Sequence, residues 1–153
     1  MSQFRTSPQS FVSICLLAFL VASCAGAPAP ESAAAPPSLY EQLGERPGID
    51  AVVDAFVAEL EADERIAHYF VEIDHERFRE QLGDQLCMVT GGPCVYEGLD
   101  MEVAHAGLGI THADFTALVE DLVAALTSHG VSQEAQNDLL ALLGPLEPQI
   151  VEE

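Results

Sequence analysis

The chain has 153 residues and a formal net charge of −20 at pH 7, with 25 acidic residues against five arginines and no lysine. A chain of this length forms one domain with one modest core. The composition argues against nucleic acid and against an anionic lipid surface as partners, because clustered basic side chains are needed to hold either.

Residues 1–23 have the composition of a signal peptide. Arg5 gives the start a positive charge, and the apolar run after it is too short to span a membrane as a mature helix. Small residues then precede Cys24, which resembles the cleavage and acylation site of bacterial lipoproteins. The alternative is an ordinary secretory signal that is cut at residues 25–29. Ala25 directly after the cysteine resembles an outer-membrane sorting signal, so we expect a lipid anchor on the periplasmic face of that membrane.

Residues 24–37 combine the predicted lipidated cysteine with a stretch rich in Ala and Pro that cannot build a core. We expect this stretch to be a semi-extended tether that holds the folded part away from the membrane. Two or three acyl chains would anchor it stably, since each buried methylene contributes ~0.8 kcal/mol. The roughly 115 residues that remain, 38–153, are enough for a single domain.

The first half of this domain predicts two helices and a corner. Ser38 and Glu41 form a capping box, which predicts a short helix that ends at Gly44. Pro47-Gly48 predicts a second boundary. Residues 63–70 are expected to form a short helical corner. Between these boundaries, six apolar residues have the spacing of one helix face: Ile49, Val52, Val53, Phe56, Val57 and Leu60.

The second half predicts three longer helices and one short one. Asp74, Thr111 and Ser132 are expected to cap the long helices. The Gly-Gly-Pro sequence from Gly91 ends the first of them, and Pro145 with its neighbours should distort the end of the last. No strand alternation is present, which predicts an all-α fold. The apolar stripes are Phe78, Leu82, Leu86 and Val89, then Phe115, Leu118, Val119, Leu122, Val123 and Leu126, and finally Leu139, Leu140, Leu142, Leu143 and Leu146.

Three motifs stand in a fixed order along this domain. They are Ser38-Leu-Tyr-Glu-Gln-Leu-Gly44, Gly91-Gly-Pro-Cys-Val-Tyr-Glu-Gly98 and Val103-Ala-His-Ala-Gly-Leu-Gly-Ile-Thr111. In order and spacing they resemble the group I truncated haemoglobins. The resemblance implies a truncated globin fold, which is a two-over-two helical sandwich, and haem b as the cofactor. It also implies that His105 is the proximal ligand of the haem iron.

The resemblance further implies the residues on the other side of the haem. Phe70 takes the position of a phenylalanine that packs on the ring, and Phe56 and Leu86 belong to the same pocket. The family usually places a Tyr where this chain has Val57 and a Gln where it has Leu82; a third distal position falls on Phe78.

All three distal positions are therefore apolar, which predicts the loss of a hydrogen bond to the gas ligand. A bond to such a charged acceptor contributes roughly 1.5–3 kcal/mol, so its loss would speed oxygen release roughly ten- to a hundredfold. Nitric oxide and carbon monoxide are less polar when bound and would be affected less. Gln81 and Gln85 flank Leu82, and a small helix rotation would turn one of them inward; solvated surface positions are the alternative.

Several other side chains could bind iron or form a disulfide bond. His68, His75 and Met88 could bind iron but do not fall on the distal positions of the family. Cys87 and Cys94 are the pair left after the leader and the lipidated cysteine, and in an exported protein such a pair favours a disulfide over free thiols.

The resemblance leaves three functions open. The first is binding of oxygen, nitric oxide or carbon monoxide for transport, storage or sensing. The second is a haem enzyme that removes nitric oxide, as a dioxygenase, or peroxide; it would need a reductant that the sequence does not identify. The third is a structural lipoprotein that has kept the fold without haem, against which His105 and Phe70 argue.

Overall fold

The structure, a computed structural model, describes residues 35–152 of the chain. These residues form one compact unit. The predicted signal peptide, Cys24 and most of the predicted tether lie outside the described residues. Within the described part no helix is both long enough and apolar enough to cross a membrane.

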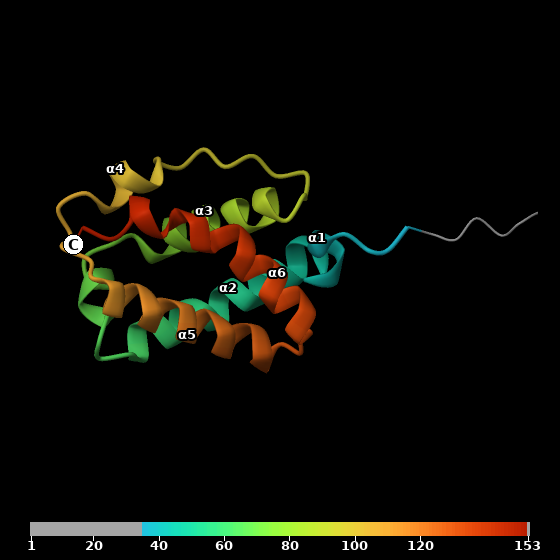
Figure 1. Cartoon of the computed structure of the whole chain (residues 1–153), viewed down its shortest axis with the longest axis horizontal. Helices are drawn as coiled ribbons and strands as arrows, with labels where there is room; N and C mark the ends of the chain where they lie inside the picture. The colour runs from blue at the N-terminus through green and yellow to red at the C-terminus, as the bar shows by residue number, and fades with distance from the viewer. Residues whose placement is uncertain (1–34, 153) are drawn as a thin grey trace, which may run out of the picture. The chain divides into compact units, whose positions relative to one another are not determined.

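Residues 35–152 fold into helices and loops, with no strand among them, as the sequence predicts. Helix α2 packs on both α3 and α5, and α6 packs on α5. Figure 1 shows two antiparallel pairs, α2 with α3 and α5 with α6, which lie one over the other. This arrangement confirms the predicted two-over-two sandwich. The elements are α1 (Leu39–Gln42), α2 (Glu45–Ala62), η1 (Ala67–Phe70), α3 (His75–Val89), α4 (Met101–His105), α5 (His112–Ser128), α6 (Gln133–Leu143) and η2 (Gly144–Gln149), where η denotes a 3₁₀-helix.

The helices begin at side chains that accept hydrogen bonds from otherwise unpaired N–H groups. Ser38 and Glu41 form the predicted capping box at α1, and Thr111 forms another with Asp114 at α5. The Asp74 carboxylate accepts from the N–H of Arg77 at the start of α3. The helix starts predicted at Ser38, Asp74 and Thr111 are therefore confirmed, because short-range capping chemistry decides them.

The boundary predicted at Pro47-Gly48 is wrong. Both residues lie within the first turns of α2, which begins at Glu45. Proline is tolerated at the start of a helix because the N–H that it lacks has no partner there. The boundary lies at Gly44, whose φ of 84° is in the left-handed region. Gly48 serves close packing instead, since a Cβ there would lie 2.1 Å from the carbonyl oxygen of Leu43.

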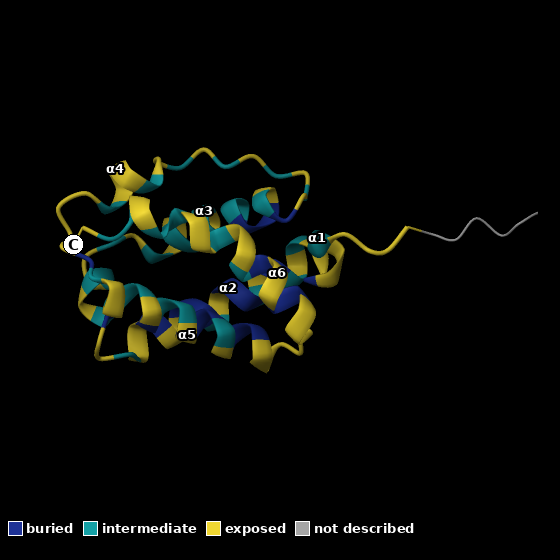
Figure 2. Ribbon diagram, in the orientation of Figure 1, coloured by how far each residue is buried: buried dark blue, intermediate teal, exposed yellow. Residues whose placement is uncertain are grey.

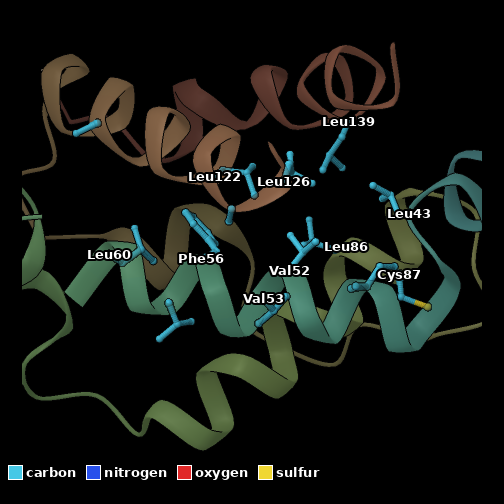
Figure 3. Close-up of a cluster of buried hydrophobic side chains, with 14 of the residues drawn as sticks. Leu43, Val52, Val53, Phe56, Leu60, Leu86, Cys87, Leu122, Leu126 and Leu139 are labelled. Carbon is cyan, nitrogen blue, oxygen red and sulfur yellow. The ribbon is translucent and has the colours of Figure 1, made fainter. Parts of the chain in front are cut away.

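The core is centred on α2. All six residues of its predicted apolar face are buried, none more than 3 % exposed. Figure 2 shows the buried residues running along α2 and the side of α5 that faces it, and Figure 3 shows Leu122 and Leu126 of α5 together with Leu139 of α6 near these side chains. Leu142 is an exception to the predicted core, because it is 45 % exposed. Leu142 follows Leu139 by three residues, which turns its side chain about 60° away from that of Leu139 and toward solvent.

A disulfide bond joins Cys87, near the end of α3, to Cys94 in the loop that follows. It closes a short loop, and the chain-entropy estimate for such a loop is roughly 2–3 kcal/mol of stability. Close packing at the same place requires Gly92, where a Cβ would lie 2.7 Å from the sulfur of Cys87. The bond fixes the start of the long loop that leads to α4.

Asp121 is a buried carboxyl group on the otherwise apolar side of α5. Only 9 % of the residue is exposed, and its Oδ2 atom has no hydrogen-bond partner. Burial, followed by the charge of Asp63, raises the pKa of Asp121 above its ordinary value. The ionised form is therefore a cost to the folded state.

We predict that Asp121→Asn stabilises the protein at neutral pH by roughly 1–2 kcal/mol. Because the folded-state pKa is raised, the cost of ionisation is absent below the unfolded pKa near 3.8 and grows as pH rises through the folded value. Urea unfolding at pH 7 and near pH 3.8 measures the difference, which should shrink at the lower pH. Asp138→Asn, on the exposed side of α6, is the matched control and should change little. A gain that is equal at both pH values would contradict this explanation.

Candidate functional site

A cavity of about 530 Å³ lies between α3 on one side and α4, α5 and η2 on the other. Its walls are mostly apolar. Helix α5 contributes Phe115, Leu118, Val119 and Leu122, and the C-terminal part of the chain contributes Leu140, Leu143, Leu146 and Ile150. A cavity with such walls suits a large apolar ligand.

His105 is the last residue of α4, and its imidazole lines the cavity. Its Nδ1 atom lies 2.7 Å from the carbonyl oxygen of Met101, one turn earlier on the same helix. A carbonyl oxygen only accepts, so Nδ1 carries the hydrogen and donates it. The other ring nitrogen, Nε2, is then left with a free lone pair, which is the form of imidazole that binds a metal.

Local chain geometry places this imidazole. The Asp100 carboxylate accepts from the N–H of Glu102 at 3.0 Å and starts α4. The helix is five residues long and ends at His105, where the N–H of Leu108 donates to the histidine's carbonyl oxygen at 3.2 Å. Ala104 and Leu108 line the cavity beside the ring, so His105 is the polar member of an otherwise apolar stretch of wall.

The opposite wall contains five of the residues that the sequence assigns to the pocket. Phe70 and Phe78 lie side by side, with 5.6 Å between their ring centroids. Phe56 comes from α2, and Leu82 and Leu86 come from the same helix as Phe78. The structure thus brings all five together with His105 around one cavity.

Val57 is the one predicted pocket residue that does not line the cavity. It is 1 % exposed and belongs to the core cluster of α2. Phe56 and Val57 are neighbours on α2, and of the two the longer phenylalanine side chain is the one that reaches the cavity. The expectation for Val57 is corrected accordingly.

Four polar side chains besides His105 and Asp114 reach the cavity, namely Tyr69, Gln81, Gln85 and Tyr96. The sequence left open whether either glutamine turns inward, and it assigned the two tyrosines no role in the pocket. A clue to the glutamines was available, since Gln81 and Gln85 lie one residue before and three residues after Leu82 and so border the same stripe.

Three of these four side chains already have a hydrogen-bond partner in the protein. The Tyr69 hydroxyl donates to Oδ2 of Asp114 at 3.0 Å, and the Tyr96 hydroxyl donates to the carbonyl oxygen of Leu99 at 2.9 Å. Burial is the main cause that raises the pKa of both tyrosines. The Gln85 amide donates to the sulfur of Met101 at 3.6 Å. Gln81 is the one of the four whose side chain makes no hydrogen bond among the described residues.

The other candidate ligands do not line the cavity. This holds for His68, His75 and Met88, as the sequence analysis expects. His129 lies at the end of α5, where its Nδ1 donates to the carbonyl oxygen of Ala125 at 3.0 Å. His105 is thus the histidine that the described part of the chain places at the cavity.

Comparisons with known proteins agree with this geometry. The family model for bacterial-like globins matches residues 38–152. The chain belongs to the bacterial-like truncated globin family. It is 37 % identical over 98 residues to a group 1 truncated hemoglobin of Tetrahymena thermophila, covering 64 % of this chain and 81 % of the relative. A group 1 truncated hemoglobin of Mycolicibacterium paratuberculosis is 32 % identical over 117 residues, covering 76 % of this chain and 86 % of that protein.

Solved structures show the same truncated globin fold. The truncated hemoglobin of Tetrahymena pyriformis in its Fe(III) form has a TM-score of 0.74 at 31 % identity, covering 76 % of this chain and 100 % of that one. The 2/2 hemoglobin of a Synechococcus species, in the cyanomet state with covalently attached heme, has a TM-score of 0.66, also at 31 % identity, and covers 71 % and 91 %.

The residues of this truncated globin fit a haem. The apolar walls suit the porphyrin, and His105 offers one free imidazole nitrogen to the iron. No lining residue is cationic, but Gln81 also borders a surface hollow that contains Arg77. The guanidinium of Arg77 has the charge that a haem carboxylate would pair with, and Glu76, Glu80 and other acidic residues line the same hollow.

Proposed function

We propose that this truncated haemoglobin holds haem b through His105 and binds a diatomic gas on the side of Phe78 and Leu82. The observation that carries the proposal is an imidazole whose Nδ1 is occupied by Met101 while its other nitrogen is free at an apolar cavity. Haem iron supplies reversible binding of small gases, and the protein sets the outcome through the polarity and access of the pocket.

The side chains opposite His105 supply apolar surface and few free donors. Phe56, Phe78 and Leu82 carry no hydrogen-bonding group. The hydroxyls of Tyr69 and Tyr96 already donate to Asp114 and to the carbonyl oxygen of Leu99, so each would have to give up that bond to donate to a gas molecule. We therefore propose weak retention of oxygen, with nitric oxide and carbon monoxide relatively favoured.

One prediction of this proposal concerns the proximal ligand. After reconstitution with haem, the protein from Ser38 onward should show a Soret band that shifts with dithionite and carbon monoxide. His105→Ala should lose this spectrum and regain it with free imidazole, because the cavity that the substitution leaves can hold the ring. His68→Ala, an exposed histidine outside the cavity, is the control and should match the wild type. An unchanged spectrum in the His105 variant would overturn the assignment.

Another prediction of this proposal concerns the wall opposite His105, where the gas would bind beside Phe78 and Leu82. Leu82→Gln places an amide donor on the wall formed by α3 and should slow oxygen dissociation roughly ten- to a hundredfold. Leu82→Met has a similar length without a donor and serves as the control. Carbon monoxide dissociation should change less in both variants. Stopped-flow displacement measures all of these rates, and equal oxygen rates in the two variants would show that the wild-type pocket already supplies a donor.

We also propose that the protein is exported and lipid-anchored through Cys24. The support is in the sequence alone: a positively charged start, an apolar run and small residues before the cysteine. The residues after it form the tether, so the haem domain would stand off the membrane surface. Ala25 supports an outer-membrane location on the periplasmic face. The strongly acidic composition of the chain would favour an electron donor with a basic surface.

This proposal is tested on the full chain in a Gram-negative host. The mature N-terminus should begin at Cys24 and carry the mass of its acyl chains, and the protein should fractionate with outer membranes. Cys24→Ser should remove the lipid and leave the protein unprocessed or soluble in the periplasm. Cys15→Ser, inside the predicted leader, is the matched control and should behave as the wild type. A wild-type N-terminus within residues 25–29, without lipid, would support an ordinary secretory signal instead.

A further inference from the structure

The segment that follows His105 is held by a residue from the other end of the domain. The carboxylate of Glu152 accepts a hydrogen bond from the N–H of Gly107 through Oε1 and one from the N–H of Gly109 through Oε2, each at 2.5 Å. The N–H of Glu152 donates to the carbonyl oxygen of Ile110 at 3.0 Å. Three bonds thus join one residue to the connection between α4 and α5. Figure 1 shows this connection running past the C-terminal end.

The two glycines shape this connection for a carboxylate. Gly107 and Gly109 have φ values of 79° and 67°, in the left-handed region that other residues rarely adopt. No atom lies within 4 Å of a Cβ built at either position, so the backbone conformation, and not the space, requires glycine. The N–H groups of Gly107 and Gly109, two residues apart, both point to the Glu152 carboxylate, while the N–H of Leu108 between them donates to the carbonyl oxygen of His105. The bonds from Gly107 and Gly109 accordingly hold the pKa of Glu152 below its ordinary value.

The Glu152 carboxylate is itself placed by the end of the fold. Helix η2 packs against α4, and the N–H groups of Ile150 and Val151 both donate to the carbonyl oxygen of Glu147 at 2.9 Å. Ile150 lines the cavity two residues before Glu152. The same short segment therefore forms part of the cavity wall and fixes the chain beyond the histidine.

We infer that Glu152 is a positioning residue for His105, which acts by fixing the Gly107–Gly109 turn and so the direction in which the imidazole faces the cavity. The inference rests on the proposed function, because the histidine matters as a haem ligand. The histidine has an anchor on each side. Its own ring is tied back to Met101, and the backbone two residues after it is tied to Glu152.

The test compares Glu152→Ala and Glu152→Gln with Glu102→Gln. The alanine variant removes both acceptors, and the glutamine variant keeps one acceptor and loses the charge. Glu102 is an exposed acid on α4 itself whose side chain makes no hydrogen bond among the described residues, so its variant controls for charge near the histidine. Far-UV circular dichroism and thermal unfolding establish that every variant is folded.

Two kinds of measurement separate positioning from simple loop stability. In the haem-free protein, hydrogen exchange of the Gly107 and Gly109 amides should rise roughly tenfold or more in Glu152→Ala, since their partners are gone. In the ferrous haem protein, the iron–histidine stretching band in resonance Raman spectra should shift or broaden. Haem transfer to excess apomyoglobin should be several-fold faster. The glutamine variant should fall between these limits, and Glu102→Gln should match the wild type.

Each failure has a distinct signature. Faster amide exchange with an unchanged iron–histidine band and unchanged haem transfer would overturn the positioning role and leave Glu152 as a loop clamp only. Unchanged amide exchange would overturn the clamp itself. If the wild type takes up no haem, the proposed function fails before any variant is compared, and the positioning role fails with it.

Discussion

The packing of α2 between α3 and α5 is the constraint on which the rest of the domain depends. Each of its six apolar residues is almost inaccessible, so this one helix supplies much of the core of a small domain. Phe56 belongs to the core cluster and to the cavity wall at the same time. The distance between the α3 wall and the α5 wall is therefore set by the core, and a change in α2 would alter stability and the pocket together.

A cavity of about 530 Å³ in a domain this small also couples the cofactor to the fold. A cofactor that fills the cavity makes dispersion contacts with these apolar walls. Because it binds only the folded state, it stabilises the fold by mass action. A disulfide and a set of hydrogen bonds fix the chain near the cavity. The Cys87–Cys94 disulfide holds the start of the loop before α4, and the Glu152 carboxylate holds the segment after α4. The two attachments lie on either side of α4, which carries His105.

The polar groups around the cavity differ in what they are free to do. His105 leaves one nitrogen unoccupied because Met101 takes the other. Tyr69 and Tyr96 have the hydroxyl groups that could donate to a gas, yet each is bonded to another part of the protein. Residue type alone would count these tyrosines as potential donors. The hydrogen-bond geometry, and not the residue type, therefore decides which of these groups are free to donate.

Short-range chemistry made much of this protein predictable from its sequence. Capping side chains such as Ser38, Asp74 and Thr111 act on N–H groups within three residues, so helix starts could be identified from the sequence, and the apolar spacing of α2 indicated its buried face. The family motif around His105 predicted an iron ligand, and the structure places this histidine at the cavity. Other features depended on the tertiary structure, because they join residues far apart in the chain or depend on a helix's rotation against its neighbours. Packing turned Phe56 rather than Val57 to the cavity and exposed Leu142. Chain topology brought Glu152 to Gly107 across 45 residues of sequence.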